Sequence, residues 1–137
     1  MKCDVLNLAI EALATAGRVK EAAALYPVAE DMIATGFAMT YACEPSPRTS
    51  AGIAATYAGN WARAEEHHQA ALHFADNLPH KITQPIARYW YAVMLRLRNQ
   101  TDDHPRARVL LQEALGMCES LSFPFYAGQI RAELAAL

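Results

Sequence analysis

The amino-acid sequence predicts an all-α fold built from helical hairpins stacked on one another. Alanine is its commonest residue, with 28 of 137 positions, and alanine combines the highest helix propensity with room for helices to approach closely. Apolar residues recur at three- and four-residue intervals, in segments divided by short breaks. Part of the pattern also repeats after 42 residues, from Gly17 to Gly59, and periods of this length are typical of helical repeats.

The first predicted hairpin covers residues 4–16 and 19–35. Asp4 is the expected N-cap of its first helix, because a short carboxylate accepts from free N–H groups at a helix start. Pro27 lies inside the second segment and should kink that helix or break it locally, since proline removes a backbone donor. Gly36 is the expected stop of the second segment.

The second hairpin is predicted over residues 48–58 and 61–78, with a glycine turn at Gly59 between its helices. Residues 37–47 come before it and form the least regular stretch of the chain. Two prolines near the end of that stretch favour an extended or turning backbone. Pro79 closes the second helix.

The third hairpin follows over residues 83–99 and 105–121, with a polar break at 100–104. A short terminal helix is expected over 123–137. The length fits one domain. Residues 1–137 are therefore assigned to a single repeat domain, with units at about 4–35, 46–78 and 82–121 and a terminal helix at 123–137.

Self-similarity between the hairpins supports this division. Small residues recur after each turn, where the second helix of a hairpin crosses the first at close range, and an aromatic residue can pack over that crossing. The matched positions are Gly17, Ala22, Tyr26 and Ala29 with Gly59, Ala64, His68 and Ala71, and then Ala64, Ala71 and Leu72 with Ala107, Ala114 and Leu115.

Residues 58–72, AGNWARAEEHHQAAL, resemble the second helix of a tetratricopeptide repeat, and residues 51–58 fit the first helix of such a unit. Roughly the last 90 residues are similar to C-terminal helical repeats of bacterial regulators that join a signalling-type ATPase to such repeats, some with a cyclase or DNA-binding domain. The resemblance implies a TPR-like, right-handed α-α superhelix of about three hairpins plus a C-terminal helix. It also implies a protein-protein interaction scaffold and not an enzyme. The chain has no Walker-type phosphate loop.

In TPR-like hairpins the first helices line a concave groove that holds a peptide or a regulatory partner. Transferring that arrangement predicts a groove whose side chains mix polar, aromatic and charged groups. The predicted groove residues are Asp4, Asn7, Glu11, Thr49, Ile53, Thr56, Tyr57, Tyr89, Val93 and Arg96. The alternative is a small-molecule sensor or minor enzyme, with a pocket between units near Tyr57, Tyr89, Trp90 and Arg96.

No metal, cofactor or catalytic site is predicted. Glu65 and His68 form an ExxH pair, but the metal bundles that use this spacing need a second pair, which the sequence lacks. The serines lack a nucleophile-elbow context. Cys3, Cys43 and Cys118 are too far apart for a CxxC metal site, and we expect them to be small core residues in a reducing compartment.

The charge and hydropathy patterns favour a protein partner. The net charge of −2 argues against nucleic acid, which needs a clustered basic surface. We expect no membrane partner and a cytoplasmic location, because no apolar run approaches the length of a membrane span and no export signal stands at the N-terminus. A homodimer through one end of the stack is also expected, because each repeat buries its apolar side against a neighbour.

Overall fold

A computed structural model describes residues 2–36 and 46–137, and in this part of the chain it contains helices and no strand, which confirms the all-α prediction. None of these helices is both long and apolar enough to cross a membrane. The predicted break at 37–47 and the core role of Cys43 fall almost wholly outside the described residues. The helices are α1 (Lys2–Thr15), α2 (Val19–Ala24), α3 (Tyr26–Ala34), α4 (Pro47–Tyr57), α5 (Trp61–Asn77), α6 (Thr83–Arg98), α7 (Asp103–Ser120) and α8 (Pro124–Ala136).

Three of the turns between helices share one geometry. Each has a residue of positive φ just after the helix, namely Gly17, Gly59 and Ser122. The next N–H donates to a carbonyl five residues back, as Arg18 does to Leu13 at 2.8 Å and Phe123 to Cys118 at 2.9 Å. This is the Schellman arrangement, which satisfies carbonyls left free at a helix end. The glycine turns predicted from the repeat therefore have matching backbones.

Two helix starts depend on local sequence chemistry. The predicted helix over 19–35 divides into α2 and α3, and Pro27 lies in the first turn of α3, which confirms the local break at this proline. Asp4 lies within the first turn of α1 and is not its N-cap, because α1 begins at Lys2. The carboxylate still lies near the positive end of the helix dipole.

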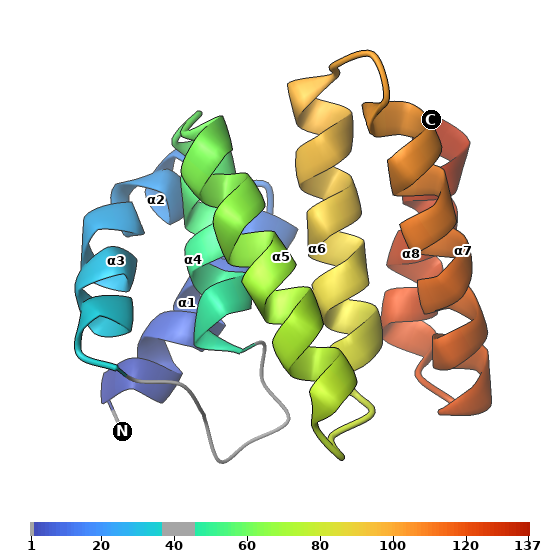
Figure 1. Cartoon of the computed structure of the whole chain (residues 1–137), viewed down its shortest axis with the longest axis horizontal. Coiled ribbons are helices and arrows are strands. Elements are labelled where there is room, and N and C mark those ends of the chain that lie inside the picture. Colours follow the sequence, from blue (N-terminus) through green and yellow to red (C-terminus); the bar gives the residue numbers. More distant parts are fainter. Residues whose placement is uncertain (1, 37–45) are drawn as a thin grey trace.

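The helices pack in two rows (Figure 1). In one row α1, α4, α6 and α8 contact one another in succession. The other row contains α2 and α3 together, then α5, then α7, and its members contact the first row. Each hairpin thus places its first helix in one row and its second in the other.

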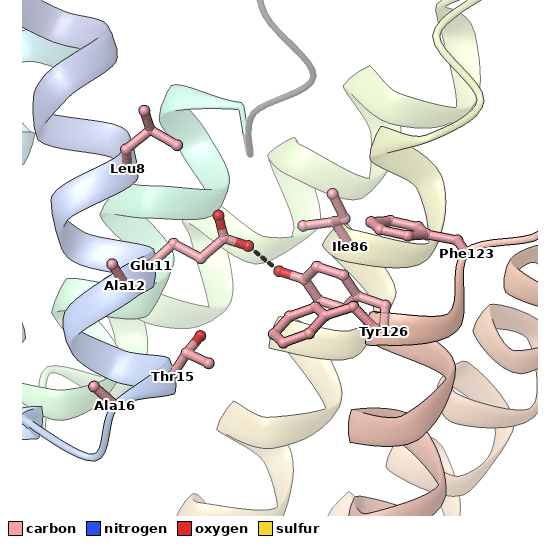
Figure 2. A pocket seen from close by; sticks show the side chains of 9 residues that line it. Leu8, Glu11, Ala12, Thr15, Ala16, Ile86, Phe123 and Tyr126 are labelled. Carbon is pink, nitrogen blue, oxygen red and sulfur yellow. Dashed lines mark hydrogen bonds between the residues drawn. The ribbon is translucent and has the colours of Figure 1, made fainter.

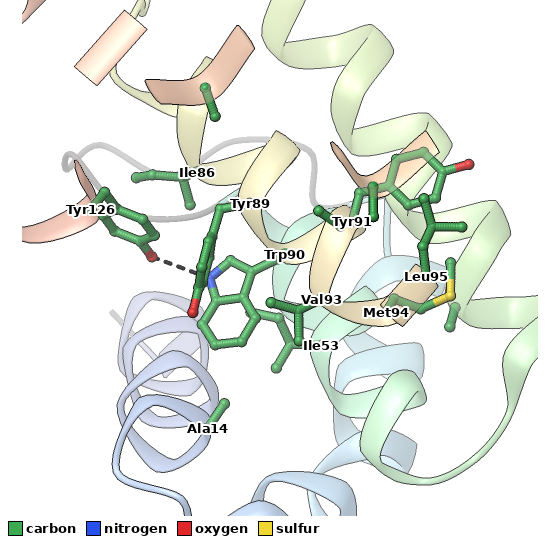
Figure 3. Packing of buried hydrophobic residues seen from close by; sticks show 14 of the residues in the cluster. Ala14, Ile53, Ile86, Tyr89, Trp90, Tyr91, Val93, Met94, Leu95 and Tyr126 are labelled. Carbon is green, nitrogen blue, oxygen red and sulfur yellow. Dashed lines mark hydrogen bonds between the residues drawn. The ribbon is translucent and has the colours of Figure 1, made fainter. Parts of the chain in front are cut away.

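The core follows α4 and α6, which have neighbours on nearly every side. Every residue from Ser46 to Thr56 except the half-buried Arg48, and every residue from Pro85 to Leu95, is buried. Around Trp90 the packing joins α4, α6 and α8, with Ile53 on one side and Tyr126 on another (Figure 3). Cys118 is buried with a free thiol, which agrees with its expected core role.

Candidate functional site

A groove of about 550 Å³ lies between α1 and α8, two helices from opposite ends of the chain (Figure 2). Its walls are largely apolar, and the Glu11 carboxylate is among them. The lining residues are Leu8, Glu11, Ala12, Thr15 and Ala16 from α1, Ile86 from α6, and Phe123, Phe125 and Tyr126 from the start of α8. The groove has the size of pockets that hold small ligands or single side chains of a partner.

The turn before α8 places three aromatic rings along one wall of the groove. Ser122 adopts φ 53°, which ends α7, and Pro124 then starts α8 in its first turn. The rings of Phe123 and Phe125 lie 5.2 and 5.4 Å from that of Tyr126, centre to centre. Tilted and edge-on contacts at such distances are favourable between aromatic rings, so this wall is held by its own packing.

Tyr126 also connects three helices through hydrogen bonds. The indole N–H of Trp90 on α6 donates to the Tyr126 hydroxyl at 3.1 Å. That hydroxyl in turn donates to the Oε1 atom of Glu11 on α1. Because the phenol has only one proton, accepting from Trp90 and donating to Glu11 fixes its direction. The carboxylate at the groove is therefore oriented by the core.

The rim of the groove is exposed and apolar. Leu8 is 47% exposed and Phe125 is 53% exposed. Glu11 is partly exposed between them. Large apolar side chains beside an oriented charged group are typical of surfaces that recognise a partner.

Most of the residues predicted to line a concave groove pack between helices. Asn7, Thr49, Ile53, Thr56, Tyr89 and Val93 are each at most 6% exposed. The physical reason is that α4 and α6 are covered on both sides, by α1 and α8 among others. The structure places these six side chains in the core, whereas the sequence predicted them in a groove. Asp4, Glu11, Tyr57 and Arg96 are partly exposed, and their groove role stays a prediction.

The residues of the alternative pocket do lie close together. Arg96 donates to Glu133 on α8 at 2.6 Å, and this ion pair raises the pKa of the guanidinium. Burial raises the pKa of both Tyr57 and Tyr89, and the charge of Glu133 adds to each shift. Helix α8 thus supplies the partner of Arg96 from within the chain.

One feature of the sequence indicates the α8 wall of the groove. Three aromatic residues within four positions, Phe123, Phe125 and Tyr126, begin the terminal helix directly after a turn. Three rings so close together at a helix start cannot all be buried against one neighbouring helix.

Glu65 and His68, the ExxH pair, have separate structural roles. Burial raises the pKa of the Glu65 carboxyl, but hydrogen bonds from Tyr91, Arg106 and Arg98 outweigh that effect and bring it to about 2. His68 is fully buried, which lowers its pKa to about 3. Within residues 2–36 and 46–137 no three His, Cys, Asp or Glu side chains gather as metal ligands.

A second polar cluster joins α3, α4 and α5 around His67. Arg48 donates to its Nδ1 at 3.2 Å, because a guanidinium cannot accept. His67 is therefore neutral and donates from Nε2 to Glu30 at 3.0 Å. Burial lowers the pKa of His67, and hydrogen bonds, the first from Arg63, lower that of Glu30. Every polar group in this cluster has a partner within the chain, so we assign it a structural role.

Comparisons of the chain with models of protein families, with curated proteins and with solved structures found no match.

Proposed function

We propose that this chain binds a segment of another protein in the groove between α1 and α8. The observation that carries this proposal is the exposed apolar rim of Leu8 and Phe125 around a carboxylate held by Tyr126. Exposing these apolar side chains to water costs free energy, and covering them with a partner recovers it. In this proposal the chain is a scaffold, and catalysis belongs to other proteins or domains.

The aromatic residues of the groove suit it to hold a side chain of the partner. Rings such as Phe125 combine a large contact area with few rotatable bonds, so little conformational entropy is lost when they are covered. Tyr126 is already fixed by three ring contacts. A wall that is ordered before binding raises affinity, because its ordering cost has been met in folding.

We also propose that the hairpins form a TPR-like superhelix, and that the partner is a regulatory protein. Support comes from the matching turns at Gly17 and Gly59 and from the succession of α1, α4, α6 and α8 along one row. In this arrangement the binding surface is the closing edge of the row, where α8 meets α1. It differs from an open groove along α4 and α6.

The proposal is tested by affinity purification from cells of the native host, followed by quantitative mass spectrometry. The bait pair is the wild-type chain and a Leu8→Ala/Phe125→Ala variant. Val109→Ala on α7 is the matched control, because that apolar side chain is 55% exposed away from the groove. We expect a partner recovered by the wild type and the control and lost from the double variant. Equal recovery by all three would move the interface elsewhere.

A further inference from the structure

We infer that the segment held in the α1–α8 groove is a short amphipathic helix of the partner, which lays its apolar face along Leu8, Ala12 and Ala16. This inference rests on the proposed function, and it names the kind of segment that binds. It follows from the spacing of side chains along α1, from the hydrogen bonding beside the groove, and from the size of the groove.

The α1 wall of the groove has the shape against which a helix packs. The exposed residues Ala12 and Ala16 follow Leu8 at four-residue intervals, so all three lie on one side of α1 (Figure 2). At about 1.5 Å per residue this wall is about 12 Å long, or about two helical turns. Small side chains placed one above another let a second helix come close, with its own side chains between them. The wall therefore favours an occupant whose side chains recur every three or four residues.

The composition of the lining selects an apolar helix face. Six of the nine lining residues are leucine, alanine, isoleucine or phenylalanine. Leu8 on one wall and Phe125 on the other are about half exposed, so apolar side chains on successive turns of one helix can cover both. The opposite face of that helix stays in water and is polar, which makes the helix amphipathic.

An extended peptide would find few hydrogen-bond partners in this groove. The described residues contain no strand whose edge a peptide could join. The aromatic donors beside the groove are already used, because Trp90 donates to the Tyr126 hydroxyl and that hydroxyl donates to Glu11. Backbone groups that are buried without partners cost free energy, whereas a helix pairs its own N–H and C=O groups. The groove therefore favours a helical occupant.

The size of the groove argues against a second copy of the chain as the occupant. Nine residues line it, whereas a stable interface takes about 20–30 residues from each partner. Complexes of a helix in a groove depend instead on a few apolar anchors. With about one anchor per turn, the α1 wall has room for about two or three.

The experiment selects random peptides of about 15 residues, long enough for a helix, displayed on phage against the complete wild-type chain. Phe125→Ala is the counter-selection, and Val109→Ala is the matched control, because that exposed side chain lies on α7. Calorimetry then gives dissociation constants for a selected peptide and for two analogues. One has proline at its centre, which breaks a helix, and the other has proline at its first residue, where a helix tolerates it.

We expect the enriched peptides to share apolar residues at positions i, i+3 or i+4, and i+7, and to gain helical circular dichroism when they bind. The central proline should weaken binding about a hundred-fold. The first-residue proline and Val109→Ala should leave the affinity unchanged.

Two results would overturn the inference and leave binding of a partner in the groove untouched or replaced. Peptides that need Phe125 but bind equally well with a central proline would overturn it while the proposed function stands. A wild-type dimer in sedimentation that Phe125→Ala abolishes would place a second copy in the groove instead. A selection that yields no peptide dependent on Phe125 would count against both the inference and the proposed function. If Phe125→Ala does not fold, Leu8→Ala on the opposite wall serves as the counter-selection.

Discussion

The ring of His68 on α5 lies against Gly52 on α4 so closely that a Cβ at position 52 would come within 2.7 Å of its Cε1 atom. The ring is held in place from two sides. Its plane stacks on Tyr91 with an angle of 6° between the rings, and its Nε2 atom lies 3.2 Å from the Thr56 hydroxyl. Thr56 gives its proton to the Gly52 carbonyl at 2.7 Å, so His68 donates from Nε2. The contact joins two helices of one hairpin and leads to the first prediction.

Replacing Gly52 with alanine should destabilise the fold by about 1–3 kcal/mol. Overpacking of a tight core costs this much, and it outweighs the helix propensity that alanine gains over glycine. A double-mutant cycle with His68→Ala checks the cause, by urea unfolding followed by circular dichroism. We expect the alanine at position 52 to be tolerated once the ring is removed. Additive effects would show that the ring is not what excludes a methyl group.

Ser122→Gly should stabilise the chain by about 0.5–1 kcal/mol. Serine holds a φ of 53° at this turn, a region that costs an L-residue roughly 1–2 kcal/mol, of which the flexibility of glycine in the unfolded chain cancels a part. Asn99→Gly is the control, since Asn99 has a similar φ of 54° and asparagine tolerates that region well. Thermal unfolding of the two variants should show a larger gain for Ser122→Gly. A loss of stability in that variant would contradict this account of the turn.

Stability should fall as the pH drops from about 5 towards 2. The pKa of Glu65 in the folded chain is about 2, below the usual value of about 4.3 that it has when unfolded. A lowered pKa contributes stability that is present above the unfolded value and lost as the pH falls through the folded one. Glu30 and Asp103 are shifted in the same direction.

The Glu65 contribution is isolated by comparing wild type with Glu65→Gln in urea titrations between pH 2 and 6. The slope of unfolding free energy against pH should be smaller in the variant, by at most about 1.4 kcal/mol per pH unit, the value for one proton. Glu66→Gln on the same helix is the control, because its side chain is 56% exposed. Identical slopes for all three proteins would mean that Glu65 has no lowered pKa.

Asn7→Leu should raise the unfolding free energy by about 1–2 kcal/mol. Asn7 is fully buried, and among the residues that the structure describes neither its amide nitrogen nor its amide oxygen has a hydrogen-bond partner. Leucine has a similar size and removes the cost of burying unpaired polar atoms. The same substitution at Asn77, which is exposed and donates to a carbonyl at 2.7 Å, should bring no gain. A less stable Asn7→Leu chain would mean that the amide has a partner in solution.

The sequence predicted the helices well because their ends depend on local chemistry. Gly59 and Pro79 bracket α5, and the predicted span of 61–78 differs from the observed Trp61–Asn77 by one residue. At Pro27 the missing N–H sufficed to predict a break. Such signals act within a few residues and need no knowledge of the tertiary fold.

The candidate site could not be predicted in the same way, because it joins residues 115 positions apart, Glu11 and Tyr126. Their contact depends on how all the helices between them pack, because small rotations at every helix crossing add up along the chain. The same packing buries Asn7 and Val93, which the TPR-like arrangement had placed on a groove face.

The central claim is that the partner lies between α1 and α8, and site-specific photo-crosslinking tests it most directly. A benzophenone amino acid is placed at Phe125 in one protein and at Val109, on α7, in another. Both positions are more than half exposed. After illumination in host cells, we predict that the probe at 125 crosslinks one partner and that the probe at 109 does not. Capture of the same partner segment with equal yield from 109, or none from 125, would contradict the account.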